Sequence, residues 1–153
     1  MGNPTYQESI TVARPPEDLY AMVSDVTRMG EWSPVCKACS WEGDARGEGA
    51  WFTGHNVLPE RSWDTRSRVA VAEPGQEFAW IVGGDRVRWG YTFSAADGGT
   101  VVTESWEFLP AGLASFDERY GAEAQAQVAT RAEAARTGIP ATLAAFKRTA
   151  ESA

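Results

Sequence analysis

Alternating hydrophobic and polar positions predict a sheet-rich chain that ends in a helix. Residues 5–12 alternate as a β-strand, and six further strand-like segments follow, separated by turn sequences such as GDARGEG, EPGQ and AADGG. Strands joined by such short turns pair antiparallel. The pattern therefore predicts a seven-stranded antiparallel meander, whose other strands span residues 38–43, 49–57, 62–73, 76–82, 86–95 and 100–108.

Helical patterns lie on both sides of these strands. Pro15 and Pro16, followed by acidic residues, predict a short helix after the first strand, and a second short turn or helix is predicted at residues 26–32. Between residues 116 and 150, apolar residues recur every three or four positions, which predicts one long helix. Alanines occupy the middle of this apolar stripe, so we expect the helix to leave space over a curved sheet. We expect Pro140 to kink or break the helix.

Composition limits the possible functions. With 153 residues, 43% of them hydrophobic and 23% charged, the chain fits a single domain over residues 1–153. The apolar runs are too short for a membrane span, and the N-terminal residues lack the pattern of a secretory signal, so we expect a cytoplasmic protein. A net charge of −7 repels phosphate backbones, so we expect no nucleic-acid partner.

Cysteine and tryptophan raise separate questions. Cys36 and Cys39 form a single C-x-x-C motif, and the chain has one histidine, His55, so the usual zinc ligand sets are incomplete. We therefore predict no metal and no cofactor, and expect two reduced thiols in a loop near the core, with metal or redox chemistry as the alternative. The seven tryptophans indicate either a bulky core or an aromatic-lined cavity.

One acidic residue does not fit its strand. In the segment GTVVTESWEF, alternation places Val102, Glu104, Trp106 and Phe108 on one face. That face is apolar except for Glu104. Burying an ionised carboxylate without a partner costs several kcal/mol or forces the group to take up a proton. Glu104 is therefore the first candidate for a functional residue.

The order of predicted elements, together with several segments, resembles a known superfamily. The chain is similar to START-like (SRPBCC) proteins, which include Bet v 1 allergens, plant abscisic-acid receptors and bacterial polyketide cyclase/dehydrase-type proteins. The segments MGEWSP, FTGHN, FAWIVGGDRVRWGYTF, GGTVVTESWEF and TLAAFKRTAE resemble its single-domain members common in actinobacteria. The resemblance covers nearly the whole chain. It implies an α+β helix-grip fold, with the sheet wrapped around a long C-terminal helix.

The resemblance also implies a cavity for a lipid, hormone or polyketide between helix and sheet. In the abscisic-acid receptors, the segments resembling TVVTESW and GGDRVRWGY direct a glutamate and a tyrosine into that cavity. These residues correspond to Glu104 and Tyr91 here, which we take as candidate catalytic residues. The receptors' ligand-closing loops and carboxylate-binding lysine have no clear counterpart, so abscisic acid is not inferred.

Strand alternation, together with the family likeness, selects further inward-facing residues. The likeness favours Phe52 and Asn56 facing inward and His55 facing solvent, while alternation places Trp89 beside Tyr91 on the inward face. The complete set of predicted ligand-binding residues is Trp32, Phe52, Asn56, Trp63, Thr65, Ser67, Trp80, Trp89, Trp106, Phe116, Tyr120 and Ala124.

These residues suggest binding of a hydrophobic, ring-containing small molecule. Glu104 could act as a general acid or base while Tyr91 holds a carbonyl or enolate oxygen, which would suit the cyclisation or dehydration that polyketide cyclases assist. A non-catalytic lipid or small-molecule carrier or sensor is the alternative, and the sequence leaves enzyme and binder undecided. A third hypothesis for the protein is an interaction module with an exposed aromatic patch. For Glu104 itself, the alternative is a structural carboxylate whose hydrogen bonds are satisfied.

Overall fold

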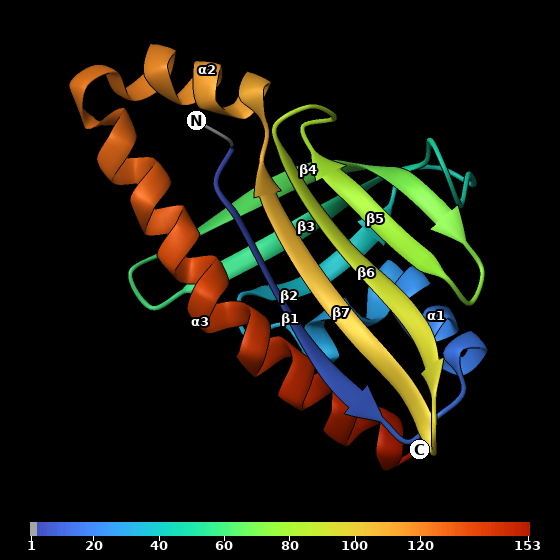
Figure 1. Ribbon diagram of the computed structural model, residues 1–153. Coiled ribbons are helices and arrows are strands. Elements are labelled where there is room, and N and C mark those ends of the chain that lie inside the picture. The colour runs from blue at the N-terminus through green and yellow to red at the C-terminus, as the bar shows by residue number, and fades with distance from the viewer. Residues whose placement is uncertain (1–2) are drawn as a thin grey trace.

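A single curved antiparallel sheet forms the frame of the molecule in a computed structural model, which describes residues 3–153 (Figure 1). The order across the sheet is β1-β7-β6-β5-β4-β3-β2, so β2 to β7 form a meander and β1 pairs with β7. The strands are β1 (Thr5–Val12), β2 (Cys36–Trp41), β3 (Trp51–Leu58), β4 (Arg61–Glu73), β5 (Glu77–Val82), β6 (Val87–Ala96) and β7 (Gly99–Phe108). The predicted seven-stranded sheet is confirmed.

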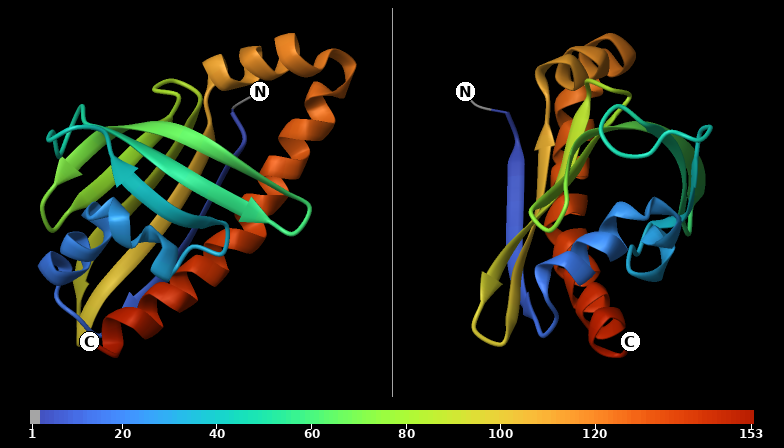
Figure 2. Two further views of the ribbon diagram at one scale, coloured as in Figure 1. Left: turned by 180° about the vertical axis from the view of Figure 1, so that it is seen from behind. Right: turned by 90° about the vertical axis from the view of Figure 1, so that its right-hand side faces the viewer.

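Two short helices follow β1, as the sequence predicts: α1 (Pro16–Ser24) and the 3-10 helix η1 (Val26–Glu31). Pro16 starts α1 because its missing N–H would have no partner in the first turn. The sheet curves around these helices and the C-terminal helix, which is clearest in the side view of Figure 2. This arrangement is the α+β helix-grip fold that the resemblance implies.

The C-terminal helical region differs in detail from the single predicted helix. It consists of α2 (Pro110–Tyr120), a short 3-10 turn η2 (Gly121–Glu123) and α3 (Ala124–Glu151). The interruption falls at Gly121, whose φ of 54° is incompatible with a continuing α-helix. A kink or a break was expected at Pro140, and the break is wrong, because α3 runs through that residue. Pro140 is exposed, so water can replace the backbone hydrogen bond that proline removes.

The first strand of the meander also differs from the prediction. The pattern placed it at residues 38–43, whereas β2 spans Cys36–Trp41. Its register against β3 shifts between Cys36 and Ala38, which marks a β-bulge. A bulge adds one residue and reverses the alternation of the side chains after it, so simple alternation could not locate this strand.

The core lies between the concave face of the sheet and the helices. Alternation along β7 is confirmed, since Val102, Glu104, Trp106 and Phe108 are all buried. The end of α3 is tied to β1 by a hydrogen bond from Lys147 Nζ to the Thr11 carbonyl oxygen (2.6 Å). Within residues 3–153, no helix is both long and apolar enough to cross a membrane. The largest fully buried side chains are Phe78, Phe108, Phe146, Leu19, Ile139 and Leu143.

Candidate functional site

A buried carboxyl group and a buried phenol lie side by side at the centre of the concave face. Glu104 on β7 is directly opposite Tyr91 on β6, and Phe78 on β5 continues the same row. Residues directly opposite in an antiparallel pair point to the same face and can interact. On the other side of Glu104 the row ends at Glu8 of the edge strand β1, which is exposed. The two predicted catalytic residues are therefore neighbours.

Burial dominates the chemistry of Glu104. Only 4% of this residue is exposed, and burial raises the pKa of its carboxyl to about 8, although a hydrogen bond from the Tyr91 hydroxyl lowers it in part. Burial likewise raises the pKa of Tyr91 well above its usual value, and the charge of a deprotonated Glu104 adds to that rise. At neutral pH, Glu104 is thus mainly a protonated acid that can itself donate a hydrogen bond.

One oxygen of this carboxyl group lacks a partner. Among the described residues 3–153, Glu104 Oε1 is the buried side-chain nitrogen or oxygen atom without a hydrogen bond. Leaving such an atom unsatisfied costs about 1–3 kcal/mol, and a satisfied structural carboxylate would not carry this cost.

Aromatic rings surround Tyr91. Its ring lies 6.0 Å from Trp80 on β5 and 6.4 Å from Phe146 on α3, measured between ring centroids. Phe146 in turn meets Trp32 edge to face at 5.1 Å, and Trp80 lies 6.0 Å from Phe52. Rings at these distances form favourable aromatic pairs, so the interior around the carboxyl group is an aromatic wall of low polarity.

Polar side chains enter the interior from β3 and β4. Asn56 is buried, and its Nδ2 donates to Thr65 Oγ1 (3.2 Å) and to the Trp63 carbonyl oxygen (3.3 Å). Ser67 is buried on the same face of β4. His55 faces solvent as predicted and pairs with Asp64 through Nδ1 at 2.7 Å, so it lies outside the interior.

A second aromatic cluster lies where β7 joins α2. Phe108 meets Trp106 at 6.0 Å and Phe116 at 4.9 Å, and Phe116 meets Tyr120 at 5.1 Å. Ala124, at the start of α3, is buried, whereas Trp63 on β4 and Trp89 on β6 are half-buried. Six of the predicted ligand-binding residues thus belong to two aromatic clusters, Trp32, Phe52 and Trp80 around Tyr91, and Trp106, Phe116 and Tyr120 around Phe108. Contact of any predicted residue with a ligand remains a prediction.

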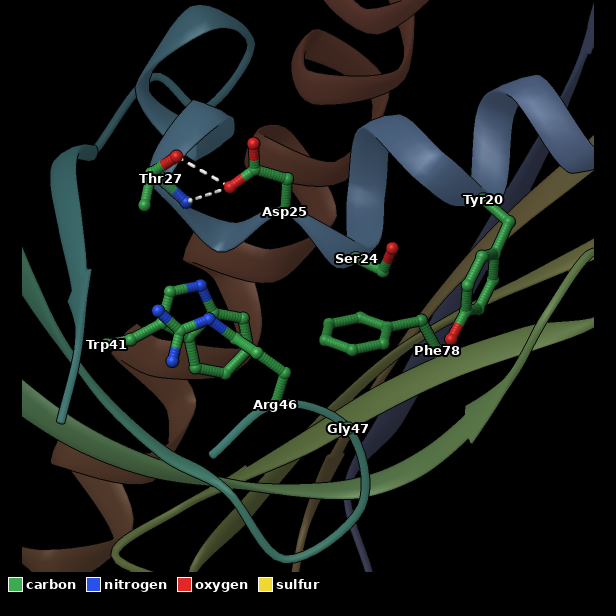
Figure 3. A pocket seen from close by; sticks show the side chains of 8 residues that line it. All are labelled: Tyr20, Ser24, Asp25, Thr27, Trp41, Arg46, Gly47 and Phe78. Atoms are coloured by element: carbon green, nitrogen blue, oxygen red, sulfur yellow. Dashed lines mark hydrogen bonds between the residues drawn. The ribbon is translucent and has the colours of Figure 1, made fainter. Parts of the chain in front are cut away.

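An open pocket of about 530 Å³ lies at the α1 end of the sheet, and Figure 3 shows its walls. None of the predicted ligand-binding residues lines it. Phe78 reaches it from the sheet, and the Phe78 ring is 6.0 Å from Trp80, so this pocket borders the aromatic wall. Two of the lining residues are in contact, since the Arg46 guanidinium lies over the Trp41 ring, 4.8 Å from the ring centroid. The lining residues are Tyr20, Ser24, Asp25, Thr27, Trp41, Arg46, Gly47 and Phe78.

Sequence reasoning missed this pocket because its residues come from three separate segments. Tyr20, Ser24 and Asp25 belong to α1 and its end, and Arg46 and Gly47 belong to the loop between β2 and β3. Three glycines of that loop, at 43, 47 and 49, have φ between 73° and 90°. The glycine-rich composition signalled a loop, but not which helix it would face.

Comparison with known proteins identifies relatives over the whole fold. A family model described as polyketide cyclase / dehydrase and lipid transport matches residues 4–151. A Polyketide_cyc-like protein, Cgl2372, from Corynebacterium glutamicum is 48% identical, with a TM-score of 0.72 over 97% of this chain and 92% of that one. None of the curated proteins matches the chain.

More distant structures share the fold. The di-domain ARO/CYC StfQ from the steffimycin biosynthetic pathway is 15% identical, with a TM-score of 0.74 over 99% of this chain and 51% of that one. Protein Ms6760 from Mycobacterium smegmatis is 16% identical, with a TM-score of 0.69 over 98% of this chain and 92% of that one. At these identities the likeness establishes the architecture alone.

Proposed function

This chain belongs to the polyketide cyclase / dehydrase and lipid transport family, and from that premise we propose that it binds a hydrophobic, ring-containing small molecule against its aromatic wall. The aromatic residues around Tyr91 suit flat apolar rings. The observation that carries the proposal is Glu104 Oε1, a buried oxygen without a partner. A bound molecule with a carbonyl or hydroxyl oxygen would satisfy this carboxyl group.

The proposed chemistry is acid catalysis of aldol-type dehydration or cyclisation. With a pKa of about 8, Glu104 holds a proton at neutral pH and can transfer it to a departing hydroxyl group, which leaves as water. As the C–O bond breaks, the other oxygen of the same carboxyl group accepts the proton from the carbon next to the carbonyl group, and the electron pair of that C–H bond forms the conjugated C=C bond. Tyr91, whose raised pKa keeps it protonated, would hold the developing enolate oxygen. Neither step requires a cofactor.

Binding is tested with 1,8-dihydroxyanthraquinone as a ring-containing probe and palmitate as an acyclic one, followed by quenching of tryptophan fluorescence. We expect saturable binding of the anthraquinone, weakened about tenfold by Glu104→Leu because one buried hydrogen bond is lost. Glu8→Gln is the matched control, because it removes a carboxylate from the same row of the sheet at an exposed position, and it should bind as wild type does. Equal affinity in Glu104→Leu would contradict the proposal.

Catalysis is tested separately with an aryl β-hydroxyketone, whose loss of water produces a conjugated enone that absorbs in the ultraviolet. We expect wild type to accelerate this reaction and Glu104→Gln to abolish the acceleration while remaining folded. Binding of the anthraquinone without any acceleration by wild type would favour the carrier or sensor function. Tight binding of palmitate alone would contradict the preference for rings.

A further inference from the structure

The two cysteines lie together on the inner face of the edge strand β2. Cys36 is paired with Asn56 of β3, and Cys39 is paired with Gly54. Residues 36 and 39 would face opposite sides of a regular strand, because alternation has a period of two. The bulge between Cys36 and Ala38 adds one residue, and both thiols therefore point to the face that also carries Asn56. The bulge is what makes them neighbours.

The sulfur atoms are in contact. Cys36 Sγ lies 3.3 Å from Cys39 Sγ, and both are free thiols. They converge over Gly54, where an added Cβ would lie 3.4 Å from Cys36 Sγ and 3.5 Å from Cys39 Sγ. Gly30 of η1 packs closely against the backbone of Lys37 in the bulge, since an added Cβ on Gly30 would collide with the Lys37 carbonyl oxygen. The fold thus fixes the two thiols at a short distance.

The surroundings make the two thiols unequal. A hydrogen bond from the Cys39 thiol lowers the pKa of Cys36, helped by backbone groups of Ala38 and His55 and opposed by burial. The same hydrogen bond and burial raise the pKa of Cys39. Cys36 therefore has the more stable thiolate, and the thiolate is the form that reacts with oxidants. Cys36 is 7% exposed, so a small oxidant suits it better than a bulky one.

We propose that Cys36 and Cys39 are a redox-active modification site, which hydrogen peroxide converts to an intramolecular disulfide. The Cys36 thiolate attacks one oxygen of the peroxide, the O–O bond breaks, and with one proton the products are a sulfenic acid and water. The Cys39 thiol then attacks the Cys36 sulfur, displacing a second water and forming the S–S bond. Overall, two thiols lose two electrons and two protons, and one peroxide becomes two waters. A thiol reductant reverses the change.

The first experiment treats the folded protein with hydrogen peroxide and follows it by intact mass and peptide mapping. We expect the mass of wild type to fall by about 2 Da and peptide mapping to show one disulfide linking residues 36 and 39. Dithiothreitol should restore the original mass in full. Dimers linked through cysteine, or irreversible gain of two or three oxygens on either cysteine, would overturn the proposal. A wild type that keeps both thiols when folded, but forms the disulfide in urea, would overturn it as well.

The second experiment separates the roles of the two residues with the matched variants Cys39→Ser and Cys36→Ser, each treated with peroxide in the presence of dimedone, which traps sulfenic acids. We expect several-fold more trapped Cys36 in Cys39→Ser than trapped Cys39 in Cys36→Ser, because backbone groups of Ala38 and His55, which both variants keep, lower the pKa of Cys36. Equal trapping, or more trapping at Cys39, would contradict the assignment of Cys36 as the attacking residue. If one variant fails to fold, the wild-type disulfide map remains decisive for the site.

Discussion

Glu104 and Asp64 occupy equivalent places in the sheet but meet opposite surroundings. Each is directly opposite a side chain that can hydrogen-bond to it: Tyr91 for Glu104, and His55 for Asp64. Glu104 faces the aromatic interior and is 4% exposed, whereas the side chains of His55 and Asp64 are 53% and 66% exposed on the convex face. Water solvates the outer pair and is largely excluded from the inner one.

This comparison shows that the side of the sheet, more than the partner, determines the state of a carboxyl group here. Tyr91 does lower the pKa of Glu104, yet burial outweighs it and leaves the value at about 8. A cross-strand hydrogen bond contributes about 1 kcal/mol, whereas the loss of hydration of a buried charge is several times larger. The same strand geometry thus produces a solvated hydrogen-bonded pair on one face and an uncharged acid on the other.

The largest effect that tests this comparison is the pH dependence of stability. Below pH 4.5, Glu104 is protonated in the folded and the unfolded chain. As pH rises towards 8, the folded chain keeps a proton that the unfolded chain loses, so the contribution of Glu104 to stability declines and is gone above about pH 8. The difference between a pKa of 4.5 and about 8 corresponds to about 4 to 5 kcal/mol.

Glu104→Gln removes this proton equilibrium and keeps the shape of the side chain. Urea unfolding from pH 4 to pH 9 should show the variant gaining on wild type by about 4 to 5 kcal/mol over that range. Two pH profiles that remain parallel would mean that Glu104 titrates alike in the folded and unfolded chain, and the interior would then resemble the surface.

A second change should make the interior pair resemble the exterior pair. Phe146→Ala removes the ring that covers Tyr91, which should cost about 3–5 kcal/mol of unfolding free energy and admit water to Glu104, so that its pKa falls. Phe108→Ala is the matched control, because Phe108 is equally buried but contacts Trp106 and Phe116. It should cost a similar free energy and leave the pKa of Glu104 at about 8. Equal pKa changes in both variants would contradict a local role for Phe146.

A smaller effect concerns the partner itself. Tyr91→Phe removes the hydroxyl group that lowers the pKa of Glu104, so that pKa should rise further, and one lost hydrogen bond should cost about 1 kcal/mol. Carbon NMR titration of the glutamate carboxyl groups measures the first quantity and urea unfolding the second. A fall in the pKa of Glu104 would mean that the tyrosine acts mainly by excluding water.

The smallest effect is expected on the convex face. Asp64→Asn breaks the pair with His55, and because both side chains are more than half exposed, the free energy of unfolding should change by less than about 1 kcal/mol. Thermal unfolding in low salt checks this. A loss of several kcal/mol would show that the outer pair is as important to the fold as the inner one.

The sequence predicted the positions of Glu104 and Tyr91 more accurately than the bounds of β2 or the division of the C-terminal helical region. Alternation along β6 and β7 placed Glu104 and Tyr91 on the buried face, because regular antiparallel strands preserve that alternation. Alternation misplaced β2, because a bulge follows Cys36. Helical periodicity missed the division of the C-terminal helices, which the positive φ of Gly121 causes. The pocket beside Tyr20 was missed because tertiary packing, rather than any local pattern, brings its segments together.

The most direct test is the pKa of Glu104 itself. Protein labelled with carbon-13 at the glutamate side-chain carboxyl would be titrated by NMR from pH 3 to pH 10, with Glu104→Gln used to assign the resonance. A midpoint near 8 for this carboxyl group is the predicted result, because burial outweighs the Tyr91 hydrogen bond. A midpoint at or below 4.5 would contradict the account, because Glu104 would then be an ionised, satisfied structural carboxylate with no proton to donate at neutral pH.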